Sequence, residues 1–152
     1  MKKYEFTGET KRVELWNRTA TLHRIKATVE FGFVKVGKLG GWIEKEENLS
    51  HEGKAWVCGD AEVWGNAKVC GDAEVFLASH VLVMGSVGSR NDFTTFFRDK
   101  DNEITVKCGC FLGKIDKFLE KVTQTHGNNK YALVYRAAVE VAKLQIELTE
   151  RK

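Results

Sequence analysis

The chain has 152 residues, 43% of them hydrophobic and 30% charged, which is enough for one domain, with or without a small second module, around a real core. Its net charge of +3 is too small to indicate nucleic-acid binding by itself. Charged residues interrupt the apolar runs near the N-terminus and no run is long enough to span a bilayer, so we expect neither a signal peptide nor membrane insertion. Four cysteines without the spacing of a disulfide framework predict a reduced, cytoplasmic setting.

Residues 1–38 alternate apolar and polar side chains, which is typical of short β-strands. Gly8-Glu9 predicts the turn of a hairpin. Residues 21–29 also fit a short helix, and this alternative stays open at the level of sequence. We expect the segment to form a β cap over the first turn of the structure that follows it.

Residues 39–90 contain the strongest pattern in the chain, because valine recurs there at intervals of six residues: Val57, Val63, Val69, Val75, Val81 and Val87. A small residue lies two positions before each valine, and glycine lies four positions before each of the first four. This unit predicts a short strand followed by a tight corner. Three such strands make a triangular turn of about eighteen residues, so we expect these stacked pairs: Val57 with Val75, Val63 with Val81, and Val69 with Val87.

The run VCGDAEVWGNAKVCGDAEV resembles the repeat of hexapeptide proteins, which fold as a left-handed parallel β-helix. The resemblance implies a mainly β chain, in which a short left-handed parallel β-helix over residues 39–90 lies between the N-terminal β cap and a C-terminal ββαα module. The fold serves acyltransferases, anhydrase-like enzymes and scaffolds without chemistry, so it does not imply an activity.

A second resemblance is narrower. The runs VKVGKLGGWIEKEENLSHEGKAWV and GDAEV/GNAKV look like a group of phage and prophage proteins, over roughly residues 3 to 90, and SRNDFTTFF and KCGCF are similar to segments of the same proteins. This resemblance implies a phage or mobile element in a bacterial cytoplasm. It supplies no catalytic residue.

After Val87 the repeat stops, and residues 91–152 predict the C-terminal module. The expected elements are strands at 93–98 and 104–111 joined by a polar turn at 99–102, a helix over 114–126 ended by Gly127, and a helix from Lys130 to about Leu148 capped by Asn128 or Asn129.

In the hexapeptide register the residue after each valine points outward, and five of these positions are apolar: Cys58, Trp64, Cys70, Phe76 and Leu82. A monomer would leave such stripes in water, so they predict a homotrimer with parallel axes. The alternative is that terminal segments of the same chain cover them.

Candidate catalytic residues are few. If the chain were an acyltransferase, His51 or His80 would be its general base, but neither has a carboxylate at a spacing that would orient it. Cys108 and Cys110 alternate on a predicted strand without a histidine or cysteine pair to complete a site, which favours structural thiols over a metal centre. We therefore expect no catalytic residue, no metal and no cofactor, and the sequence favours a protein that is not an enzyme.

The richest polar cluster follows the repeat and consists of Ser89, Arg90, Asn91, Asp92, Thr94, Thr95 and Arg98, with Lys107 on the facing strand. Guanidinium and hydroxyl groups suit a phosphate, and neighbouring phenylalanines suit a base. The cluster predicts a site for a small anionic, nucleotide-like ligand. Its alternative is a hairpin whose polar residues form the corner.

The main functional hypothesis is a non-enzymatic phage accessory protein that sequesters such a ligand and thereby counters host immune signalling. The alternatives are a hexapeptide-type acyltransferase and a purely structural or protein-interaction module. Partners would be further copies of the chain and the small ligand, with neither a membrane nor a strong nucleic-acid signal.

Overall fold

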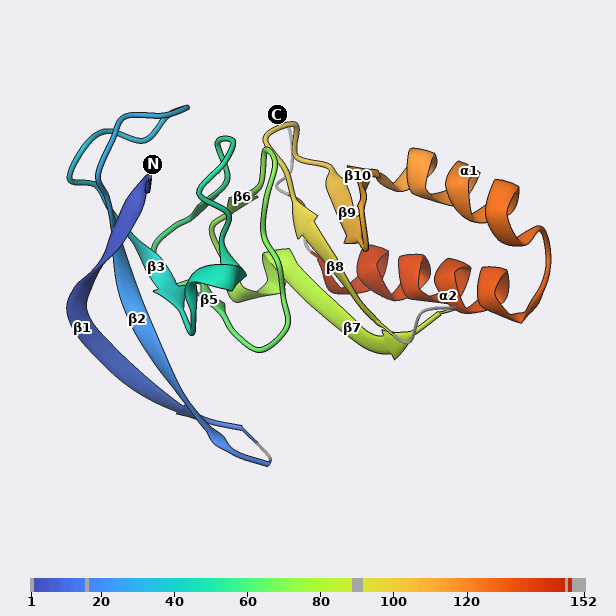
Figure 1. The fold of residues 1–152 in the computed structure, drawn as a ribbon, viewed down its shortest axis with the longest axis horizontal. Coiled ribbons are helices and arrows are strands. Elements are labelled where there is room, and N and C mark those ends of the chain that lie inside the picture. The colour runs from blue at the N-terminus through green and yellow to red at the C-terminus, as the bar shows by residue number, and fades with distance from the viewer. Residues whose placement is uncertain (1, 16, 89–91, 147, 149–152) are drawn as a thin grey trace.

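The computed structural model describes residues 2–15, 17–88, 92–146 and 148 (Figure 1). Within these residues the chain is mainly β, with three separate sheets of four, two and four strands and two helices. Figure 1 shows a long hairpin at one end and a sheet covered by helices at the other end. Between them lies a middle segment, residues 44–80, which we call the winding segment.

The first sheet has the strand order β1-β2-β3-β5. Its strands are β1 (Tyr4–Glu14), β2 (Thr19–Ala27), β3 (Leu39–Ile43) and β5 (Glu62–Val63). The hairpin turn lies between β1 and β2, and Gly8-Glu9 lies at a register irregularity within β1, so the predicted turn position was wrong. Residues 21–27 are strand rather than helix, because β2 pairs with β1 on one side and with β3 on the other.

The predicted left-handed β-helix is not present. β4 (Trp56–Val57) and β6 (Glu74–Val75) form a separate two-stranded parallel sheet, and they place Val57 beside Val75 at the expected interval. The other two stacks were predicted wrongly. Val63 pairs with Ile43 and Val81 with Phe97, whereas Val69 pairs with Leu49 and Val87 with Asp92. The sheets neither close nor wind into a solenoid.

Strand length explains this outcome. The repeat units give strands of two residues, which are too short to build continuous walls. Before the repeat, the 3₁₀ turn Glu46–Asn48 changes the pairing interval, so that Trp42 lies beside Glu62. After it, Val81 begins a longer strand that pairs antiparallel with its neighbour and ends the winding. The repeat still marks burial, because the first four valines lie in one core.

The third sheet is antiparallel and has the order β10-β9-β8-β7. Its strands are β7 (Val81–Val87), β8 (Asp92–Arg98), β9 (Ile104–Cys108) and β10 (Phe111–Lys114). The predicted hairpin is therefore the centre of a larger sheet. Successive residues of β8 point to opposite faces of the sheet. Phe96 joins the core beneath the helices, and Phe97 joins the core of the winding segment.

Two helices cover one face of this sheet (Figure 1). α1 (Ile115–His126) ends at Gly127, which has a positive φ of 62°, as the sequence predicted. α2 (Lys130–Gln145) is capped at its N-terminus by Asn129, whose side chain accepts a hydrogen bond from the backbone N–H of Ala132. No helix in the described part of the chain has the length and apolar character needed to cross a membrane.

The five apolar positions behind the trimer prediction are each at least partly covered within a single chain. Trp64 packs against Ala20, Leu22 and Trp42 of the first sheet, and Leu82 packs against the core beneath the helices. Cys58 and Cys70 lie against the core of the winding segment. Segments on either side of the repeat thus cover Trp64 and Leu82, and all five side chains are half-buried. The homotrimer stays a prediction.

Candidate functional site

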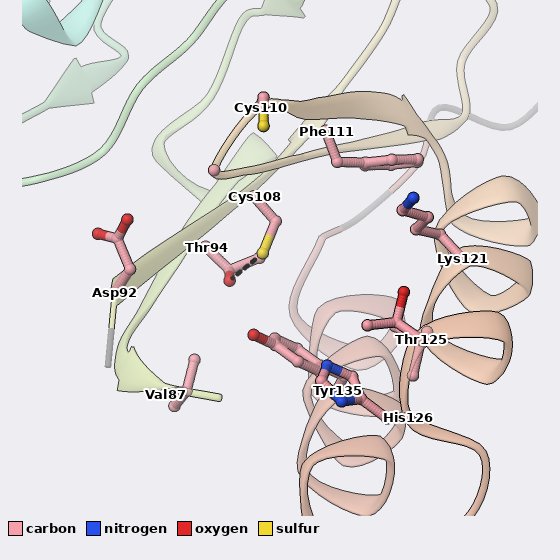
Figure 2. Close-up of a pocket in the computed structure, with 12 residues that line it drawn as sticks. Val87, Asp92, Thr94, Cys108, Cys110, Phe111, Lys121, Thr125, His126 and Tyr135 are labelled. Atoms are coloured by element: carbon pink, nitrogen blue, oxygen red, sulfur yellow. Dashed lines mark hydrogen bonds between the residues drawn. The ribbon is translucent and has the colours of Figure 1, made fainter. Parts of the chain in front are cut away.

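A cavity of about 160 Å³ lies between the third sheet and the two helices, where β8 begins and β9 ends (Figure 2). We call it the helix-side cavity. It is lined by Val87, Asp92, Thr94, Cys108, Gly109, Cys110, Phe111, Lys121, Val122, Thr125, His126 and Tyr135.

The strand wall of the cavity is set by a tight turn. Cys108 and Phe111 are paired residues at the ends of β9 and β10, so Gly109 and Cys110 are the two turn residues between them. Gly109 has a φ of 58°, a conformation that favours glycine. The Thr94 hydroxyl donates to Cys108 Sγ at 3.4 Å, which fixes both side chains at this wall.

The helix wall is aromatic. Tyr135 of α2 is 6% exposed and meets the Phe118 ring edge to face, with centroids 5.6 Å apart. The His126 ring stacks on Tyr135 at 5.9 Å and also contacts Tyr131 at 5.6 Å. Figure 2 shows His126, Tyr135 and Lys121 on the helices, opposite Thr94 and Cys108 on the strands. A ligand here would lie between aromatic faces with polar groups at the rim.

Close backbone packing fixes the position of Tyr135. A Cβ atom placed on Gly88 would lie 1.9 Å from the Tyr135 hydroxyl oxygen, so the phenol touches the chain just after β7. Gly88 also has a φ of 80°. Only glycine fits this contact and this backbone conformation together.

A second, smaller cavity of about 100 Å³ lies on the opposite face of the same strands, toward the winding segment. We call it the coil-side cavity. It is lined by Asn66, Lys68, Asp92, Phe93, Thr95, Lys107 and Gly109. Asp92 and Gly109 line both cavities, which therefore meet at this end of the sheet.

The predicted ligand residues are divided between these two faces. Asp92 and Thr94 line the helix-side cavity, whereas Asp92, Thr95 and Lys107 line the coil-side cavity. Ser89, Arg90 and Asn91 lie outside the described residues.

Arg98 lies at the far end of β8, away from both cavities. Its guanidinium donates to the Asn102 side chain and to the Glu74 backbone carbonyl, each at 3.0 Å, and lies over the Phe76 ring. These contacts tie β8 to the winding segment.

The two candidate bases are engaged in structural contacts. His51 Nδ1 accepts the backbone N–H of Lys3 at 3.1 Å, its Nε2 lies 3.1 Å from Glu46, and its ring stacks on Tyr4. His80 is 3% exposed, and its Nδ1 accepts from the backbone N–H groups of Phe76 and Leu77. An imidazole whose acceptor nitrogen is already bonded to the backbone cannot take a proton from a substrate without breaking that bond.

Sequence reasoning did not identify the aromatic wall. Tyr135 lies four residues after Tyr131 on α2, and its side chain is buried. A tyrosine among the buried positions of a helix is the sequence signal that could have identified it, because its hydroxyl group needs a polar neighbour. His126 is the last residue of α1 and carries no local signal of a site. Its neighbours come from another helix, so its role depends on how α1 and α2 pack.

The amino-acid sequence matches no protein-family model and no curated protein. The resemblance to phage and prophage proteins therefore stays a prediction.

Proposed function

We propose that this protein binds a small ligand that carries a flat ring, and that the ring occupies the helix-side cavity. The observation that carries the proposal is the wall of three rings, those of Phe111, His126 and Tyr135, around a space of about 160 Å³. A cavity of ~150 Å³ accepts one benzene ring. Stacked or edge-on contacts with such walls favour a flat ring over a branched aliphatic group.

The polar groups at the rim favour a nucleotide-like ligand. Lys121 supplies a cation, and His126, Thr94 and the thiols supply hydrogen-bonding groups, whereas Asp92 supplies an acceptor. A nucleobase carries donors and acceptors on its edge, and a nucleotide adds an anionic group for the lysine. The ligand class is thus the one expected from the predicted polar cluster, of which Asp92 and Thr94 line this cavity.

Binding is favoured over catalysis because His126, the imidazole in the lining of the helix-side cavity, is stacked on Tyr135 and makes no ion pair with a carboxylate of the described residues. His51 and His80 line neither the helix-side nor the coil-side cavity, and their Nδ1 atoms accept backbone hydrogen bonds. His51 lines a third, broader hollow with its Nε2 3.1 Å from Glu46, but its bonded Nδ1 does not favour the general base of an acyltransferase.

The wider role in this proposal is sequestration of a signalling nucleotide, in the bacterial cytoplasm, by a protein of a phage or mobile element. The resemblance of the repeat to phage proteins is its only support, whereas the ring-binding proposal depends on the cavity.

The test is thermal unfolding of the protein with the four ribonucleosides and their 5′-monophosphates. A bound ligand raises the midpoint in proportion to the logarithm of its concentration over its dissociation constant. Thr125 lines the cavity from an exposed position on α1, so Thr125→Trp fills the space with little effect on the core. Gln124→Trp, also exposed on α1 but outside the lining, is the matched control.

We expect at least one compound to raise the midpoint of the parent and of Gln124→Trp, and to have no effect on Thr125→Trp. If no compound shifts the parent, or if Thr125→Trp responds as the parent does, the ring does not bind in this cavity.

A further inference from the structure

The coil-side cavity brings together two lysines from distant parts of the chain. Lys68 follows β5 in the winding segment, and Lys107 is on β9. Both also line a broader hollow of about 590 Å³, whose lining includes Cys70, His51 and three carboxylate residues, Glu46, Glu47 and Glu52. Lys68 and Lys107 thus border two hollows, and the coil-side cavity is the one with fewer carboxylates in its lining.

Half of the sixteen lysines in the described part of the chain are neutralised by carboxylates, and Lys68 and Lys107 are not among them. Eight lysine side chains make ion pairs with carboxylates: Lys2, Lys11, Lys26, Lys35, Lys100, Lys114, Lys117 and Lys143. Within the described residues, the ammonium groups of Lys68 and Lys107 have no carboxylate within ion-pair distance. Two unneutralised cations beside one cavity repel each other and attract an anion.

Thr95 adds a neutral donor to the same cavity. Its side chain is 2% exposed, and its Oγ1 accepts the backbone N–H of Lys68 at 3.0 Å. Because that bond uses the oxygen as acceptor, the hydroxyl hydrogen is available to a ligand oxygen. Lysine acts as a point charge toward phosphate, and a hydroxyl donor beside two lysines suits a tetrahedral anion.

Asp92 works against an anion, because its carboxylate lines this cavity too. Its Oδ1 accepts the backbone N–H of Phe93 at 2.7 Å. Two cations against one anion still leave the cavity positive, and the aspartate makes a clear prediction, since neutralising it must tighten anion binding.

The geometry points to a phosphate subsite formed by Lys68, Lys107 and Thr95 in the coil-side cavity. Since this cavity meets the helix-side cavity at Asp92 and Gly109, the phosphate of a bound nucleotide lies on one side of the strand ends and its ring on the other. The ring contact rests on the proposed function, whereas the phosphate contact does not require it.

The experiment is a titration of ¹⁵N-labelled protein with inorganic phosphate, followed by amide chemical shifts at constant ionic strength, with chloride as the reference anion. We expect saturable shifts at the amides of Lys68, Thr95 and Lys107. Lys68→Gln and Lys107→Gln should each weaken phosphate binding about tenfold, since each removes one charged hydrogen-bond donor from the subsite. Asp92→Asn should strengthen it. Lys130→Gln, at the exposed start of α2, should leave it unchanged.

Thr125→Trp separates the two proposals. It should abolish nucleoside binding and leave phosphate binding intact, and the advantage of a nucleoside monophosphate over its nucleoside should vanish in the Lys68→Gln Lys107→Gln double variant. The subsite is refuted if phosphate gives no shifts beyond those of chloride, if both lysine variants bind phosphate as the parent does, or if Thr125→Trp loses phosphate binding.

Discussion

Two buried polar side chains, those of Lys3 and Asn48, hold the winding segment in place by hydrogen bonds to its backbone. Lys3 is 4% exposed and donates to the carbonyls of Gly53 and Ala55, and burial lowers the pKa of its ammonium to about 8. Asn48, fully buried, donates to the carbonyls of Gly65 and Ala67. Such bonds replace the regular sheet ladder that two-residue strands cannot provide.

The contacts of Glu44 with Arg18 and Gly65 should make the stability of the fold depend on pH. The Arg18 guanidinium, which binds both of its oxygens, is the main cause that lowers the pKa of this carboxyl to about 2, and the Gly65 N–H adds to the effect. The folded state therefore binds its proton less readily than the unfolded state, whose pKa is about 4.5. The stabilisation is complete above that value and is lost as pH falls from about 4.5 toward 2.

We expect Glu44→Gln to lower the unfolding midpoint by about 3 °C at pH 7 and to cause almost no change near pH 2. Thermal unfolding followed by circular dichroism at several pH values measures this difference. Glu52→Gln, an exposed site, is the control. A Glu44→Gln deficit of the same size at pH 2 and pH 7 would contradict the assignment.

At the scale of elements, the sixfold valine spacing predicted which side chains are buried but not how the strands pair. Val57, Val63, Val69 and Val75 are each at most 1% exposed, as a repeat with an inward valine requires. Pairing depends on strand length and on partners outside the repeat. β3 and β8 supply those partners, and no periodicity within residues 57–87 refers to them.

The candidate site could be predicted in part for the same reason. Thr94 and Thr95 were grouped because they are adjacent in sequence, but neighbouring residues of a strand point to opposite faces. The sequence thus grouped residues that line two cavities on opposite faces of the sheet. The aromatic wall depends on α2 packing over β7, a contact between distant elements that leaves only a weak local signal.

The contact between Gly88 and Tyr135 makes a prediction about how β7 holds α2. Gly88→Ala should reduce the unfolding free energy through both its positive φ and its clash with the phenol. Gly127→Ala has a similar φ of 62° and no atom within 4 Å of the added Cβ, so it incurs only the backbone cost. We expect the Gly88 substitution to cost at least about 1 kcal/mol more, as overpacking does. Urea unfolding of the two variants measures the difference, and equal costs would show that the contact is absent.

In the whole molecule, the third sheet lies between two hydrophobic cores. Phe97 and the repeat valines pack on one face, and Phe96 packs with the helices on the other. The two candidate cavities lie on these two faces and meet at one end. A ligand bound across that end would contact both layers, so binding would stabilise their relative position.

The four cysteines give a direct test of this arrangement without any substitution. Cys108 and Cys110 line the helix-side cavity, and Cys110 is exposed. Burial raises the pKa of Cys58 to about 11 and also raises that of Cys70, so at pH 7 these two thiols should react slowly with an alkylating reagent. Cys58 lines neither candidate cavity nor the broader hollow, so it serves as the internal reference.

The decisive measurement is the rate of N-ethylmaleimide alkylation at each cysteine, read by mass spectrometry of peptides, with and without each of the four ribonucleoside 5′-monophosphates. We predict that at least one of them slows alkylation of Cys108 and Cys110 about fivefold or more and leaves Cys58 unchanged, as occupancy of the helix-side cavity requires. Unchanged rates at Cys108 and Cys110 with all four compounds would contradict ligand binding in this cavity.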